Sequence, residues 1–187
     1  MLTKGRFYAT LFIISIVVFL SWAVVRINKA CTFNEEVKGY LQNYVEAGTM
    51  EIAIKNLNSA IEALEKAGLT EGQISIFWEN PNNNIGLWYN NLLKSRELLR
   101  KAVKESTLEQ SIILEKQKIG LSGGNENDNG TISIAIPDGI SMYPYNRFFF
   151  WWSILSAIMA IVFLIIVLVL CDSCEWDDPL IKTRNKK

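Results

Sequence analysis

Long apolar runs near the two ends of the chain dominate its pattern of hydrophobic and polar positions. Residues 7–25 form a run of 19 without a charged side chain, and residues 148–171 form a second run of 24. An α-helix rises about 1.5 Å per residue, so each run can cross a hydrocarbon core roughly 30 Å thick. The pattern therefore predicts two transmembrane helices that flank a middle section, residues 26–147.

The first run also shares a feature with secretory signal peptides, because Lys4 and Arg6 precede it. Its 19 residues exceed the roughly 7–15 of a typical signal-peptide core, and Arg26 and Lys29 disfavour cleavage after Ala30. We therefore expect this segment to be retained as a membrane anchor.

Basic residues beside the second run predict the orientation. Four follow it, whereas Arg147 alone directly precedes it; the four are Lys182, Arg184, Lys186 and Lys187. Basic residues favour the cytoplasmic side, so residues 172–187 should form a cytoplasmic tail and residues 1–6 a cytoplasmic N-terminus. The middle section would then be extracytoplasmic, in a plasma membrane or a bacterial inner membrane.

The middle section has the apolar spacing of helices. Thr32 and Glu35 match a capping box, which predicts a new helix after a break at residues 28–31. Gly48 favours a break or bend in this helix, and Gly68 favours its end. A second helix is expected to begin near Asn84. Its predicted inner face contains Ile85, Trp88, Leu92, Leu99 and Val103.

A short third helix is expected over residues 107–118. Its start matches a capping box at Ser106 and Glu109, or alternatively at Thr107 and Gln110. Its predicted inward side chains are Leu108, Ile112 and Ile113. The polar, glycine-rich residues 119–130 are typical of a flexible linker.

Two short segments have the composition of β-strands. Residues 73–78 and 131–136 share an Ile-Ser-Ile core, and pairing would satisfy their backbone hydrogen-bonding groups. The expected fold is a mainly α membrane protein. Two transmembrane helices flank a helical extracytoplasmic domain, in which the two segments either pair as a small two-stranded β element or never meet.

Composition argues against catalysis. The chain has 187 residues, 19 basic and 19 acidic side chains, and no histidine, which is the usual general base and imidazole metal ligand. No phosphate loop, dinucleotide motif or paired nucleophile and base is present, so we expect no enzymatic activity, no cofactor and no nucleic-acid partner.

Metal binding is not expected either. Residues 125–132 resemble the first half of a calcium loop, but Ile136 replaces the closing carboxylate. Cys171 and Cys174 form a single C-x-x-C, which is a weak zinc signal without a second pair. Lipid attachment and inert thiols remain open for these two cysteines.

An aromatic, asparagine-rich stretch over residues 77–93 is the first candidate binding surface. Phe77, Trp78, Trp88 and Tyr89 could contact a small polar ligand or a partner protein. The alternative is that Trp88 belongs to the core, because it lies at helical spacing from Ile85 and Leu92, while the asparagines serve turns and a helix cap.

Two further features bear on association. Ser153, Ala157 and Ala160 are small residues at helical spacing in the second apolar run, so they form either a helix-contact face or ordinary lipid-facing surface. Cys31 has no partner cysteine within the middle section, so it is either a free thiol or the site of an intermolecular disulfide.

These patterns predict a non-enzymatic two-pass membrane protein. Its partners would be the lipid bilayer and either another protein or a second copy of the chain, which the outer domain contacts in an accessory or assembly role. The alternative is an extracytoplasmic ligand-sensing domain. Because the tail is only 16 residues long, such a sensor would signal through a separate partner.

Overall fold

The computed structural model describes the backbone of residues 2–122 and 133–175, and the side chains of residues 6–122 and 133–170. All regular secondary structure within these ranges is helical. The chain divides into two compact units. One contains the first part of α1 (Leu2–Phe33), up to Arg26, and α6 (Asn146–Glu175) from Arg147 onward; the other is Ile27–Asn146.

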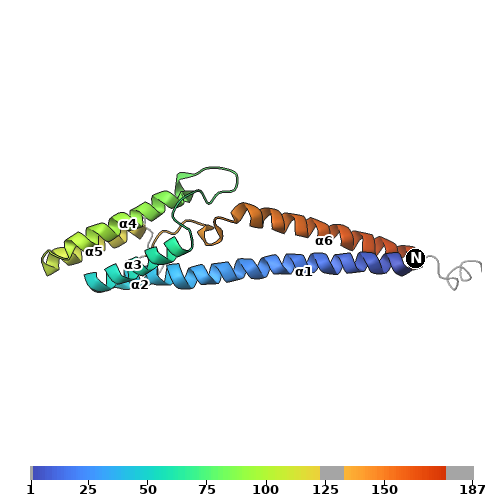
Figure 1. Ribbon diagram of the computed structural model, residues 1–187, viewed down its shortest axis with the longest axis horizontal. Helices are drawn as coiled ribbons and strands as arrows, with labels where there is room; N and C mark the ends of the chain where they lie inside the picture. Colours follow the sequence, from blue (N-terminus) through green and yellow to red (C-terminus); the bar gives the residue numbers. More distant parts are fainter. Residues whose placement is uncertain (1, 123–132, 176–187) are drawn as a thin grey trace, which may run out of the picture. The chain divides into compact units, whose positions relative to one another are not determined.

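Two helices are long and apolar enough to span a membrane. One is the continuous helical segment Arg6–Glu46, and the other is Asn146–Leu170. The N-terminal and C-terminal apolar helices, α1 and α6 in Figure 1, pack together. The expected pair of long apolar helices is therefore confirmed.

The predicted break at residues 28–31 is wrong. The helix continues from α1 through a π-helical turn, η1 (Asn34–Lys38), into α2 (Gly39–Glu46). The backbone at Phe33 is helical and its side chain makes no cap, so the capping box of Thr32 and Glu35 does not form. Residues 28–31 contain neither glycine nor proline, and a helix already nucleated in a long apolar run extends at little cost.

The core of the Ile27–Asn146 unit begins on this extended helix. Phe33, Val37, Leu41 and Tyr44 recur at helical spacing, and all four are buried. They pack with α3 (Met50–Lys66), whose buried face includes Ala53, Leu57, Ala60, Ile61 and Leu64. The domain is thus assembled directly on the segment that leaves the first apolar run.

Local capping signals set the ends of α3 and the starts of the later helices. The Thr49 hydroxyl accepts a hydrogen bond from the Ile52 amide, so the predicted break beside Gly48 is confirmed. Gly68 follows α3 with a φ of +70°, a backbone conformation that favours glycine. The Asn84 side chain accepts from the Leu87 amide and starts α4 (Ile85–Ala102), as expected.

The capping box at Ser106 and Glu109 is confirmed as the start of α5 (Thr107–Ser122). The Ser106 hydroxyl and amide both donate to the Glu109 carboxylate, and these hydrogen bonds hold the pKa of that carboxyl below its usual value. The helix continues to Ser122, four residues into the expected linker; the rest of that linker lies outside the described residues.

Helix α4 packs against α3, and α5 packs against both (Figure 1). The prediction of their inner faces is partly wrong. Ile85, Trp88, Leu92 and Leu99 are buried, but Val103 is exposed at the end of α4. On α5, Leu108 and Ile112 are exposed, and Leu114, Lys118 and Leu121 face the interior instead.

The predicted two-stranded β element is wrong for the residues that the structure describes. Residues 73–78 make one isolated bridge, between Gln73 and Asn84, across their own loop. After Ile74, the Ser75 hydroxyl accepts a hydrogen bond from the Trp78 amide and turns the chain. This local hydrogen bond replaces the pairing that a strand would need.

The described part of the second strand candidate, residues 133–136, forms neither a β-strand nor a β-bridge. Its backbone is satisfied elsewhere, because Ala135 donates from its amide to the Leu121 carbonyl and accepts from the Trp88 indole. Ile134 and Ile136 pack on the core, followed by buried Ile140 in η3 (Ile140–Met142). This segment closes the domain without a sheet.

Gly72 provides a test of this closure. Its φ is +103°, and an added Cβ would overlap the Tyr143 hydroxyl. We expect Gly72→Ala to lower the free energy of unfolding by about 1–3 kcal/mol, the usual cost of forcing atoms into a packed site. Thermal unfolding of the detergent-solubilised protein, followed by circular dichroism, measures this loss.

The control is Gly48→Ala, where an added Cβ meets nothing within 4 Å. Equal unfolding midpoints for Gly72→Ala and the unaltered protein would show that Tyr143 does not hold the loop.

Candidate functional site

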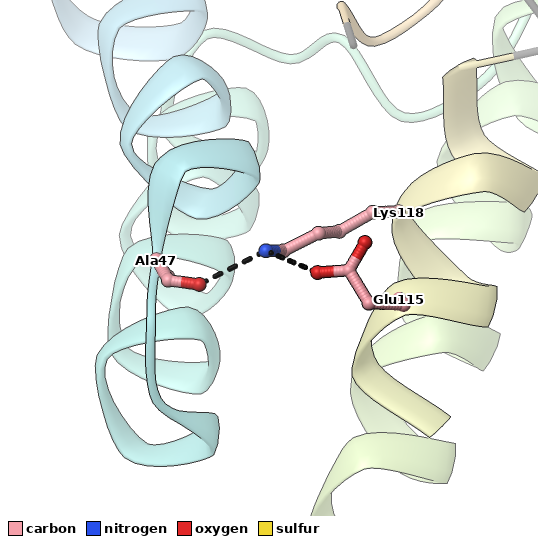
Figure 2. A network of polar contacts seen from close by, with 3 residues as sticks. All are labelled: Ala47, Glu115 and Lys118. Atoms are coloured by element: carbon pink, nitrogen blue, oxygen red, sulfur yellow. Dashed lines mark hydrogen bonds and ion pairs between the residues drawn. The ribbon is translucent and has the colours of Figure 1, made fainter. Parts of the chain in front are cut away.

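A buried lysine lies at the centre of the helical domain. Lys118 of α5 is only 6% exposed, and its ammonium donates to the Ala47 carbonyl at 2.9 Å. It also contacts the Glu115 carboxylate at 3.0 Å, one helical turn away (Figure 2). The charged group of Lys118 is therefore satisfied by one carbonyl and one carboxylate.

This arrangement fixes the corner between α2 and α3. Ala47 is the C-cap of α2, and a cation near the last carbonyls of a helix interacts favourably with the helix dipole. Glu115 is largely exposed, so its carboxylate neutralises the lysine while remaining hydrated. Sequence reasoning missed Lys118, since an isolated lysine in a polar helix is ordinarily exposed.

The structure separates the aromatic residues of the predicted binding surface. Phe77 and Trp78 are 58% and 80% exposed in the loop between α3 and α4, and their ring centroids are 5.7 Å apart. Trp88 is buried in the core, with its indole donating to the Ala135 carbonyl at 2.9 Å. Phe77 and Trp78 thus present a surface that Trp88 does not share.

Tyr89 is partly buried and bonded within the domain. Its hydroxyl donates to the Glu65 carboxylate at 2.6 Å and so joins α4 to the end of α3. Burial, with the hydrogen bond and negative charge of Glu65, raises the pKa of Tyr89 to about 12. At neutral pH this phenol is a hydrogen-bond donor.

The loop that carries Phe77 and Trp78 is closed and locally ordered. Its two ends are joined by hydrogen bonds from the Ile74 amide to the Asn83 carbonyl and from the Ile85 amide to the Gly72 carbonyl. The Asn80 side chain accepts from the Asn82 amide at the start of η2 (Pro81–Asn83). The exposed aromatic pair is therefore held by a loop of defined shape.

A polar cleft of about 530 Å³ lies beside the π-helical turn. Helical residues Asn34, Lys38 and Gln42 line one wall, and Asp138 and Ser141 of the closing segment line the other. π-Helical turns frequently occur at functional sites. Sequence analysis missed this cleft, because its two walls are about 100 residues apart in the chain and no local motif links them.

The side of α5 that is turned outward is apolar. Leu108, Ile112 and Ile119 are 71%, 59% and 54% exposed, and a cleft along this side is lined by Ile112, Lys116 and Ile119. These three apolar side chains, at spacings of four and seven residues, form the outer face of α5. The apolar spacing is visible in the sequence, but the prediction from it placed Leu108 and Ile112 in the core.

The small residues predicted to form a helix-contact face lie in a half-buried strip of α6. Ser153, Ala157 and Ala160 are partly buried, and Ser156 between them is buried. Ser15 of α1 is also buried, and it lines the same apolar cavity as Ser156. The two serine hydroxyls donate to carbonyls of their own helices, at Leu11 and Trp152.

Of the three cysteine side chains, the structure describes only that of Cys31. Cys31 is exposed and unpaired within the chain, so its thiol is accessible. The side chains of Cys171 and Cys174, and all of the calcium-loop-like residues 125–132, lie outside what the structure describes. Within the described residues, no three histidine, cysteine, aspartate or glutamate side chains come together as a metal site.

Comparison with known proteins gives no match to a family model, a curated protein or a solved structure.

The hydrogen bond from Lys118 to the Ala47 carbonyl can be tested by substitution. Lys118→Met keeps the apolar stem but removes the donor to the buried Ala47 carbonyl, so we expect a loss of about 1–3 kcal/mol in unfolding free energy. Chemical denaturation of the detergent-solubilised protein measures this loss. Lys116→Met, on the outward side of the same helix, is the matched control and should change stability by less than about 0.5 kcal/mol. Equal stability of both variants would contradict a structural role for the Lys118 ammonium.

Proposed function

We propose that this chain is a non-enzymatic two-pass membrane protein, whose helical extracytoplasmic domain binds another protein through the outer face of α5. Residues 7–25 and 148–171 would span the bilayer, and both termini would be cytoplasmic. The observation that carries the proposal is the exposure of Leu108, Ile112 and Ile119 along one side of a helix whose other side is packed in the core.

The spacing of these residues suits a partner helix. Apolar side chains separated by four and seven residues lie along one side of a helix, as in the recognition of one amphipathic helix by another. Glu115 and Lys116 lie within this stretch, so a partner with charges of both signs would match it.

The size of the face indicates what kind of partner it needs. A stable interface in solution usually buries more than about 1,000 Å² in total, which three exposed side chains cannot supply. A partner held in the same membrane would need less, because confinement raises its effective concentration. The proposed partner is therefore another membrane-anchored protein that lays a helix along α5.

Purification of the full chain in mild detergent, followed by quantitative mass spectrometry, tests this proposal. The double variant Ile112→Gln with Ile119→Gln should lower the recovery of a stoichiometric partner about tenfold, the change produced by about 1.4 kcal/mol. Leu87→Gln replaces a similarly exposed residue on α4 and should leave recovery unchanged.

Two results would contradict the proposal. One is recovery that is equal in the double variant and in Leu87→Gln. The other is recovery of this chain alone, in which case a second copy would be the partner.

A second function, sensing of a small ligand, is favoured by the polar cleft. Lys38 and Asp138 place one cationic and one anionic side chain on opposite walls, which suits a zwitterion such as an amino acid. The wall that contains Lys38 belongs to the helix that continues from the first apolar run, so occupation of the cleft would act directly on that helix.

A thermal-shift screen of the detergent-solubilised chain with the proteinogenic amino acids tests this function. At 100 times the dissociation constant, a ligand should stabilise the fold by about 2.7 kcal/mol. Lys38→Met should abolish that shift, whereas Lys55→Met on α3 should not. The absence of any shift with the unaltered protein would count against sensing of this ligand class.

A further inference from the structure

The loop that carries Phe77 and Trp78 is tied to the residue at which the second apolar helix begins. Asn146 is the first residue of α6, and its side-chain amide donates to the Ile74 carbonyl at 2.8 Å and to the Gly139 carbonyl at 3.4 Å. The Gly72 backbone lies against Tyr143 just before this helix. The base of the loop is thus fixed beside the start of α6.

Two residues of the domain that flank the apolar runs in the sequence also contact each other. The Lys29 ammonium lies 4.5 Å from the centroid of the Tyr145 ring. Lys29 follows the first run by four residues, and Tyr145 precedes the second by three. Lysine and tyrosine are typical of the boundary between lipid and water, where an apolar body and a polar tip are both accommodated.

Distances along the chain place the aromatic pair within reach of the same boundary. Trp78 is four residues after Ile74, so the two Cα atoms are separated by at most about 14 Å. Asn146 precedes the apolar run by two residues, or about 3 Å of helical rise. The headgroup layer on each side of a bilayer is about 5–8 Å deep.

The chemistry of the loop fits that layer. Residues 73–78 contain no charged side chain, and their exposed end presents a phenylalanine and a tryptophan, followed by the exposed Glu79. Exposed aromatic side chains beside neutral amides, such as those of Asn80 and Asn82, suit a region that is apolar on one side and hydrated on the other. Transfer of the exposed surface of Trp78 from water into this layer would gain its hydrophobic free energy, which the domain itself does not use.

We propose that Phe77 and Trp78 insert into the headgroup layer of the outer leaflet, as a third membrane contact besides the two helices. This inference rests on the proposed membrane placement of α1 and α6, but not on the partner of α5. The lipid surface is the occupant favoured by the tie between Ile74 and Asn146. A protein occupant of the same loop is an outcome that the experiment separates.

The test uses the full chain in vesicles of phosphatidylcholine, with Cys31, Cys171 and Cys174 replaced by serine. A single cysteine is introduced by Trp78→Cys and labelled with an environment-sensitive fluorophore. Val103→Cys, which replaces a residue exposed at the end of α4, is the control for water. Leu164→Cys, in the middle of α6, is the control for the hydrocarbon core.

The label at position 78 should be quenched by phosphatidylcholine spin-labelled near the headgroup several times more strongly than the label at position 103. Iodide in the water should quench position 103 more strongly than position 78. Quenching at 78 that equals that at 103 would overturn the inference. Shielding of position 78 from both quenchers would also overturn it, in favour of a protein contact.

The control in α6 separates this inference from the proposed function. Position 164 is tested with phosphatidylcholine that is spin-labelled in its acyl chains. If this lipid quenches position 164 and the headgroup-labelled lipid does not quench position 78, the membrane placement stands and only the loop insertion fails. If position 164 is not quenched, the membrane placement fails and the loop insertion fails with it.

Discussion

The packing of Phe33, Val37, Leu41 and Tyr44 against α3 is the interaction on which the rest of the domain depends. These side chains lie on the continuation of α1, so the segment that leaves the first apolar run is also the first wall of the core. Helix α3 packs on this wall, α4 packs on α3, and α5 packs on both α3 and α4. The domain therefore cannot separate from this helix without losing its own core.

The charged corner at Lys118 complements this apolar packing. A hydrophobic contact fixes neither the direction nor the exact end of a helix, whereas a donor 2.9 Å from the Ala47 carbonyl does both. The cost of burying the ammonium is offset by the adjacent Glu115 carboxylate and by the partial negative charge at the end of α2. One buried cation thus specifies how α2, α3 and α5 meet.

Sequence reasoning succeeded where the determinant was local. The break at Gly48, the caps at Asn84 and Ser106 and the glycine at Gly68 each depend on a few neighbouring residues, so the sequence pattern predicted these helix ends. The capping box predicted at Thr32 does not form, because the preceding apolar helix continues through it.

The predicted strands do not form, because Ala135 makes its hydrogen bonds with Trp88 and Leu121, which are distant from it in the chain. On α5, apolar residues on both sides left the inner face undetermined, and the cleft at Lys38 had no local signal.

The hydrogen bond between Asn146 and Ile74 also bears on the order in which the protein can be made. It joins residues 72 positions apart. The indole of Trp88 likewise donates to the carbonyl of Ala135, 47 positions later in the chain. Neither contact exists until the ribosome has completed nearly all of the domain, and the next residues synthesised are those of the second apolar run. Closure of the domain is therefore a late event in biosynthesis. A nascent chain that stops before Ala135 lacks both of these contacts.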